Sequence, residues 1–212
     1  MDELELLKKD WKNNNAQFKQ VSENEIYGML HKSSSSIVKW ILIICIAEFL
    51  FWGFINLLIP DSFFAIYEKL HLKTLLQASY ALHYTIVIVF IYLFYKNYKS
   101  IQVTDSTNVL MQNILNTRKT VRYFVYYNVG MTIAFSIAID TYLYNNSEKL
   151  YEVMGLAKQG IPKEGFANIF IISQIIVGFI IIALLILFYW LVYGILLKKL
   201  KGNYRELKKI NS

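Results

Sequence analysis

An apolar run of 23 residues, 37–59, limits what this chain can fold into more than any other feature. Lys39 and Glu48 are its only charged residues. As a helix the run would be about 35 Å long, at about 1.5 Å per residue. That length crosses a hydrocarbon core of about 30 Å, so we predict that residues 37–59 span a membrane.

Three further apolar runs follow, at about residues 75–95, 123–144 and 169–197, and most of the charges lie between them. The chain is 56% hydrophobic and only 17% charged, whereas soluble domains are about 25% charged. This clustering is typical of helices that are solvated by lipid. We therefore predict an all-α fold, an integral membrane four-helix bundle, in one domain over residues 33–200.

The sequence predicts a cytoplasmic helical segment at residues 1–32 and a basic tail at residues 201–212. Of the 22 Lys and Arg residues, 17 lie in the N-terminal segment, the loop after the second span and the C-terminal tail. Lys and Arg stay on the cytoplasmic side of membrane proteins. We therefore expect a multi-pass protein of the inner, cytoplasmic membrane with both termini in the cytoplasm. The net charge of +7 then reflects topology and does not indicate nucleic acid.

Glu48 lies near the middle of the first span, where a carboxylate costs about 2.5–3.5 kcal/mol on insertion scales. We expect it to face the bundle and to be protonated or paired. It is either a proton or cation site or a structural hydrogen-bonding group between helices, and His83 in the second span could approach it. Asp140, near the outer end of the third span, and Gln174, in the fourth, are expected to be structural.

Apolar stripes on the cytoplasmic side suggest binding of a partner. Leu4, Leu7 and Trp11 follow helical spacing, and Ser22 with Glu25 fits a capping box that begins a second helix. Helices this short need a cover, which could be lipid headgroups, the protein's own loops or a partner protein. The predicted partner-docking side chains are Leu4, Leu7, Trp11, Ile26, Met29 and Leu30.

Catalytic and metal-binding patterns are missing from the sequence. It has no nucleophile elbow, HExxH motif, phosphate loop or glycine-rich nucleotide fingerprint. The three histidines, His31, His71 and His83, fall in separate regions, and Cys45 is the only cysteine. We therefore expect no enzyme, no metal and no cofactor. A transporter has weak support, because no paired broken spans or inverted repeat is evident.

The segments Glu3-Leu-Glu-Leu-Leu-Lys-Lys-Asp-Trp11, Glu25-Ile-Tyr27 and Lys32-Ser-Ser-Ser-Ser-Ile-Val-Lys-Trp40 resemble the start of short, uncharacterised membrane proteins of Bacteroidota-type bacteria. Some similar sequences carry a carotenoid monooxygenase name, which the separated histidines do not support. The Leu, Leu, Trp stripe ahead of a span also resembles the cytoplasmic segment of membrane-tethered anti-sigma regulators. That resemblance implies a sigma factor as partner.

The leading functional prediction is a membrane regulatory or scaffold protein whose N-terminal cytoplasmic helices dock a protein partner. The alternative is a small proton- or ion-coupled transporter or channel that uses Glu48. We expect Tyr189, Trp190 and Tyr193, in the last turns of the fourth span, to form an aromatic belt at the membrane surface. The basic tail is interpreted as a topology anchor, with binding to anionic lipid as the alternative. The sequence leaves the oligomeric state open.

Overall fold

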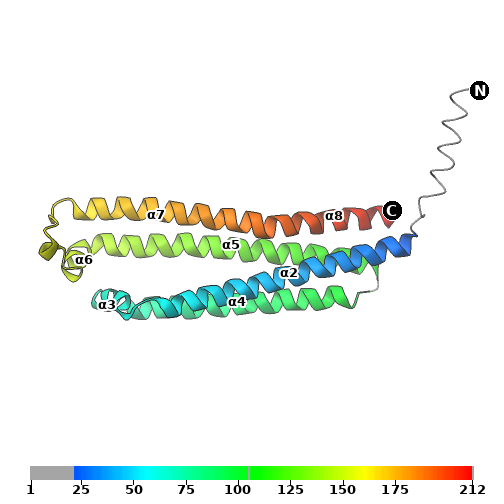
Figure 1. Cartoon of the computed structure of the whole chain (residues 1–212), viewed down its shortest axis with the longest axis horizontal. Coiled ribbons are helices and arrows are strands. Elements are labelled where there is room, and N and C mark those ends of the chain that lie inside the picture. Colours follow the sequence, from blue (N-terminus) through cyan, green and yellow to red (C-terminus); the bar gives the residue numbers. More distant parts are fainter. Residues whose placement is uncertain (1–21, 105, 212) are drawn as a thin grey trace, which may run out of the picture.

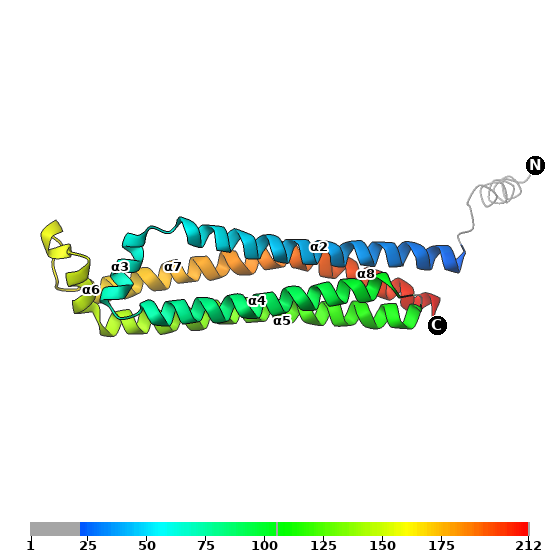
Figure 2. The ribbon, with the colours of Figure 1, turned by 90° about the horizontal axis from the view of Figure 1, so that it is seen from below.

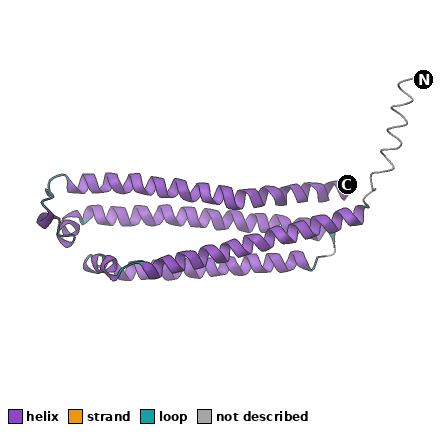
Figure 3. Ribbon diagram, in the orientation of Figure 1, coloured by secondary structure: helices purple, strands orange, loops and turns teal. Residues whose placement is uncertain are grey.

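The computed structural model describes residues 22–104 and 106–211, apart from the side chain of Asp61. Every regular element in these ranges is helical, so the predicted all-α fold is confirmed for the described residues (Figure 3). Four long helical rods lie side by side, and the start of α2 and the C-terminus are at the same end (Figures 1 and 2). Consecutive rods therefore run in opposite directions.

The rods are α2 (Glu23–Leu58), α4 (Lys73–Gln102), α5 (Thr107–Asn145) and the continuous helix made of α7 (Phe166–Tyr189), η2 (Trp190–Gly194) and α8 (Ile195–Ile210). Three short helices, α3 (Asp61–Lys69), α6 (Ser147–Val153) and η1 (Leu156–Gln159), lie in the connections at the opposite end from the C-terminus.

Among the described residues, three helices are long and apolar enough to cross a membrane: α2, α4 and the helix from Phe166 to Ile210. They indicate a membrane protein. The fourth rod, α5, does not meet the same criterion. Its first half carries Arg118, Lys119 and Arg122, and Tyr, Thr and Asn residues together with Asp140 lower the hydropathy of its second half. A crossing by residues 123–144 therefore stays a prediction.

The predicted capping box is confirmed at the start of α2. The Glu25 amide donates to Ser22 Oγ at 3.3 Å, and the Ser22 amide donates to Glu25 Oε2 at 2.9 Å. The structure differs from the sequence interpretation in that α2 continues through the serine run into the apolar segment. Asn203 donates to the hydroxyl oxygens of Ser33 and Ser34, both at 3.0 Å, so the run contributes contacts to α8.

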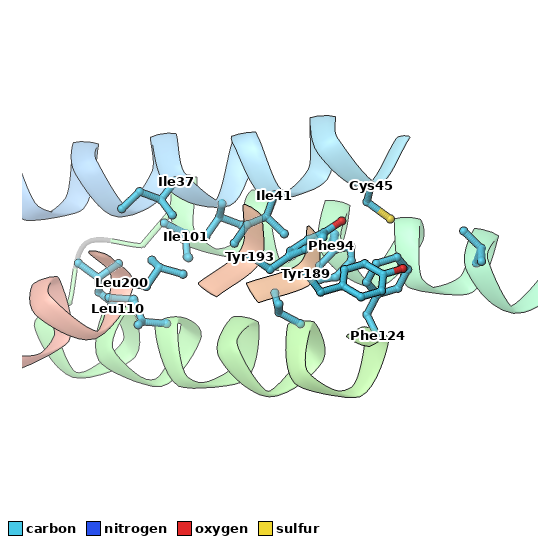
Figure 4. Packing of buried hydrophobic residues seen from close by; sticks show 14 of the residues in the cluster. Ile37, Ile41, Cys45, Phe94, Ile101, Leu110, Phe124, Tyr189, Tyr193 and Leu200 are labelled. Atoms are coloured by element: carbon cyan, nitrogen blue, oxygen red, sulfur yellow. The ribbon is translucent and has the colours of Figure 1, made fainter. Parts of the chain in front are cut away.

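The rods enclose two separate clusters of buried side chains. The large core contains apolar residues from α2, α4, α5, α7, η2 and α8, including Ile41, Phe94, Phe124 and Tyr193 (Figure 4). The small core lies at the end with α3 and α6 and includes Leu70, Leu76 and Leu143. The large core fixes the helices around Glu48.

Candidate intramembrane site around Glu48

Glu48 is half-buried on α2 and faces the continuous helix of α7, η2 and α8. The Tyr189 hydroxyl donates to Glu48 Oε1 at 2.5 Å, and the Tyr193 hydroxyl donates to Oε2 at 3.2 Å. Each carboxyl oxygen thus has its own partner. A phenol oxygen can both donate and accept, so the two tyrosines can satisfy either the charged or the neutral carboxyl group.

The two tyrosines are held by an unusual piece of backbone. Trp190–Gly194 forms a π-helical turn between α7 and α8. Such turns are rare and often occur at functional sites. Tyr189 and Tyr193 flank or belong to the turn and are only 3% and 1% exposed, whereas Trp190 between them is 68% exposed. The turn therefore directs two hydroxyl groups inward at one position.

Aromatic rings fix the tyrosines from the side. Phe124 of α5 makes an edge-to-face contact with Tyr189, at 6.1 Å between ring centroids, and a tilted contact with Tyr193 at 5.7 Å. Phe94 of α4 lies edge-to-face on Phe124 at 5.7 Å. Figure 4 shows these four rings together with Cys45. These ring contacts restrict how the two tyrosine side chains can rotate.

His83 of α4 and Glu48 line the same small cavity. The His83 ring stacks on Tyr127 of α5 at 5.8 Å between centroids, and Nδ1 is 3.3 Å from the Tyr127 hydroxyl. The structure therefore brings His83 to the same cavity as Glu48. Their tyrosine partners differ, since Glu48 bonds to Tyr189 and Tyr193 whereas His83 contacts Tyr127.

A second polar contact joins α2 to α4 near the cavity. Asn56 donates to the Tyr84 hydroxyl at 2.8 Å and to the Trp52 carbonyl oxygen at 3.0 Å. Asn128 of α5 also lines the cavity and donates to the Phe124 carbonyl oxygen at 2.8 Å. Both side chains act as hydrogen-bonding groups inside the bundle.

The structure does not bring Asp140 and Gln174 to this site. Asp140 lies at the end of α5 near α3, where burial, Tyr80 and the charge of Asp140 together raise the pKa of the Tyr67 phenol. Among the described residues Gln174 has no side-chain hydrogen-bond partner, and it is half-buried on α7. Neither residue joins the Glu48 cluster.

The predicted docking residues are only partly described. Leu4, Leu7 and Trp11 lie outside the described residues. Leu30 packs against the large core, and Ile26 is half-buried. Met29 is 57% exposed on α2, so it is the one of these three that is most available to a partner.

The sequence prediction missed Tyr189 and Tyr193, which it assigned to an aromatic belt at the membrane surface. That interpretation is wrong for these two side chains, because they are buried against Glu48. Their spacing of four residues on a helix, opposite an intramembrane carboxylate, was the available signal. The interpretation as an aromatic belt suits Trp190 better, because its side chain is exposed.

The arrangement suits proton binding or a structural connection between helices more than metal chemistry. The part of the chain that the structure describes contains no group of three or more His, Cys, Asp or Glu side chains that could hold a metal ion. Phenol and carboxyl groups at hydrogen-bonding distance can share and transfer protons.

Comparison with known proteins gives one finding. No curated protein and no solved structure matches the chain. A family model described as "Domain of unknown function (DUF8845)" matches residues 24–212, which cover the four rods and the Glu48 site. The chain therefore belongs to the DUF8845 family.

Proposed function

We propose that the chain is a four-span regulatory or scaffold protein of the cytoplasmic membrane. Both termini lie in the cytoplasm, and the cytoplasmic end of the bundle docks a protein partner. One observation carries this proposal: the rods continue well beyond the level of their basic residues as a folded, hydrogen-bonded extension. Crossing a membrane does not require such an extension.

Packing supports α5 as the fourth span. It lies against α4, α7 and α8, and all three belong to the two helices Lys73–Gln102 and Phe166–Ile210, which are apolar enough to cross a membrane. Its residues 123–144 contain one charged residue, Asp140. A rod that runs side by side with spanning neighbours over this length crosses with them. Tyr, Thr and Asn residues lower its hydropathy without adding charge.

Basic residues on all four rods mark one level of the bundle. They flank or lie beside large-core residues such as Val38, Ile101, Val121 and Leu200. Lys and Arg at such a level indicate the cytoplasmic surface of the membrane. We call this set the basic belt: Lys39, Lys96, Lys99, Arg118, Lys119, Arg122, Lys198 and Lys199.

Beyond the belt the helices form a stalk, defined as residues 23–36, 100–104, 106–117 and 200–211. At about 1.5 Å per residue, α2 begins about 24 Å before Lys39, and α8 ends about 18 Å beyond Lys198. The stalk has its own connections between helices. Tyr27 donates to the Thr104 carbonyl oxygen at 3.0 Å, and His31 Nε2 is 2.7 Å from the Ile101 carbonyl oxygen.

The stalk also offers apolar side chains to a partner. Met29 is 57% exposed, Val103 72% and Val109 50%. On the cytoplasmic side these groups face water rather than lipid, so covering them is favourable. A protein partner that binds the stalk and the N-terminal segment would bury them. A sigma factor is the partner class that the anti-sigma resemblance implies.

Topology is tested by cysteine labelling in a Cys45→Ala background, in which each variant has one cysteine. Asn108→Cys is in the stalk, and Lys149→Cys is in α6. We expect an impermeant maleimide to label Lys149→Cys on intact cells and Asn108→Cys only after the membrane is opened. If α5 does not cross, both cysteines label from the same side.

Partner binding is tested with a photo-crosslinking residue in place of Met29 or Val109, in native membranes. The matched control is Ile172, which is 56% exposed on α7 within the proposed membrane region. We expect both stalk positions to crosslink to the same protein, at a yield that falls at least fivefold with Leu7→Asp and Trp11→Ala. Crosslinks that are unchanged by the double substitution would contradict docking by the N-terminal segment.

A proton- or ion-coupled transporter is the second candidate, and the Glu48 cluster favours it. At about 1.5 Å per residue, Glu48 lies about 13 Å along α2 from Lys39, so it is well inside the hydrocarbon region. The test is proton or cation flux in liposomes. Loss of flux in Glu48→Gln but not in Glu68→Gln is the expected result for transport, and equal flux would remove Glu48 from the mechanism.

A further inference from the structure

A small cavity lies beside Glu48, between α2, α4 and α5. It is lined by polar groups from three rods and by the apolar side chains of Phe49, Trp52, Val87 and Phe124. Its volume is about 20 Å³. A water molecule needs about 10–15 Å³ of such space and two to four polar partners. The cavity is therefore the right size for one water and too small for a substrate.

The polar partners are present. Glu48 enters the cavity from α2, His83 and Tyr84 from α4, and Asn128 from α5. Glu48 and His83 are half-buried, and a carboxyl oxygen that already accepts from a tyrosine keeps a second lone pair. A water between them can donate to the carboxyl group and donate to or accept from the imidazole.

Each end of this arrangement is attached to another rod. Glu48 is bonded to Tyr189 of α7, and His83 Nδ1 is 3.3 Å from the Tyr127 hydroxyl of α5. We infer that one water binds in the cavity and bridges Glu48 to His83, which completes a hydrogen-bonded chain through all four rods. The chain runs from α7 to α2, α4 and α5.

The bridge makes Glu48 and His83 one titrating unit. The neutral carboxyl group gives its proton to the water while the water gives one of its own protons to the imidazole. The products are a carboxylate and an imidazolium, and the water is regenerated. Interacting groups of this kind titrate as a pair. The other titratable groups that face them are Cys45 from α2, Tyr84 from α4, Tyr127 from α5, Tyr189 from α7 and Tyr193 from the π-helical turn.

Infrared difference spectroscopy on the protein in lipid membranes tests the inference. The carboxyl band of Glu48 is identified by its loss in Glu48→Gln, and a bound water by its shift in ¹⁸O-labelled water. We expect the Glu48 band to shift in His83→Gln. His71→Gln, in the connection between α3 and α4, is the matched control and should leave the band unchanged.

Val87→Ile separates the bridge from the two groups that it joins. Val87 is 6% exposed and lines the cavity, so one added methylene takes the space of the water while Glu48 and His83 remain. We expect loss of the water band and the same shift of the Glu48 band as in His83→Gln. Val89→Ile is the control, because Val89 is 51% exposed on α4.

Two results would overturn the inference. One is a Glu48 band that stays in place in both His83→Gln and Val87→Ile. The other is a water band that persists in Val87→Ile, which would locate the water elsewhere. The readout needs neither transport nor a partner, so absence of flux or of crosslinks would leave the inference unchanged.

Discussion

The two ends of the bundle are packed in different ways. Around the large core, α2 buries Ser34, Ile37, Val38, Ile41 and Cys45. Of its residues 46–58, all of which the structure describes, none is buried. The continuous helix shows the same change, because within the fully described α7 only Tyr189 is buried, while α8 buries Leu200 and Leu207.

This difference follows from the solvent at each end. In lipid there is no hydrophobic driving force between helices, since the acyl chains are as apolar as the side chains. Large residues of α7 such as Phe179, which is 73% exposed, can therefore face outward at no cost. The stalk projects into water in our proposal, so its apolar residues must be covered.

The largest effect is expected for Leu207→Ala in α8. Leu207 is fully buried in the stalk, where both the transfer from water and the cavity term apply, so we expect a loss of about 3 kcal/mol in local stability. Amide hydrogen exchange of α8 measures it. The control, Leu184→Ala, removes a 60% exposed side chain on α7 and should change exchange by less than about 0.5 kcal/mol. Equal effects would contradict the comparison.

A somewhat smaller effect is expected for Phe124→Ala, which is in the large core and, in our proposal, within the membrane. Phe124 is 1% exposed and contacts four aromatic rings. Because the unfolded chain remains in lipid, only the packing and cavity terms are lost, about 2 kcal/mol. Unfolding in mixed micelles of increasing dodecyl sulfate measures it. Phe179→Ala is the matched control, and an equal loss there would show that the outward face of α7 is also packed.

Much of this architecture could be predicted from the sequence. The apolar runs and the capping box of Ser22 and Glu25 are local signals, and the structure contains the corresponding helices. In the structure α5 runs without a break from its polar first half into the apolar segment, so both patterns belong to one helix. These features depend on neighbouring residues along one helix.

The site depends on contacts between residues that are distant in the sequence, so the sequence identified only part of it. Glu48 was identified because a carboxylate in an apolar run is unusual. Tyr189 is the last residue of α7 and Tyr193 lies one turn later, and because α7 is apolar on nearly every side, hydrophobic periodicity could not reveal which face turns inward. Nothing in the local sequence marks the π-helical turn that places both hydroxyl groups against a residue more than 140 positions earlier.

Tyr189→Phe tests the polar part of the large core. Removing the hydroxyl leaves Glu48 Oε1 without its donor, and hydrogen bonds between helices in membranes contribute about 0.6 kcal/mol on average and at most about 1.7. The short 2.5 Å contact places this bond toward the upper end, so we expect a loss of about 1 kcal/mol in the same unfolding titration. Tyr193→Phe, which removes the 3.2 Å contact, should cost less. Tyr92→Phe, on a 61% exposed tyrosine, is the control, and a loss there as large as in Tyr189→Phe would contradict a special role for the Glu48 contact.

The smallest effect is expected for Asn203→Ala, which breaks the connection of α8 to the serine run of α2. Two hydrogen bonds are lost, to Ser33 and to the buried Ser34. The serine oxygens accept in these contacts, and their own hydroxyl protons can donate to the carbonyl oxygen four residues earlier. Neither hydroxyl group is then left without a partner, so the loss should be about 0.5 kcal/mol. Hydrogen exchange at residues 33–38 measures it. Gln174→Ala removes an amide with no described partner and should change nothing. If Asn203→Ala cost about as much as Leu207→Ala, the polar contacts rather than apolar burial would hold the stalk together.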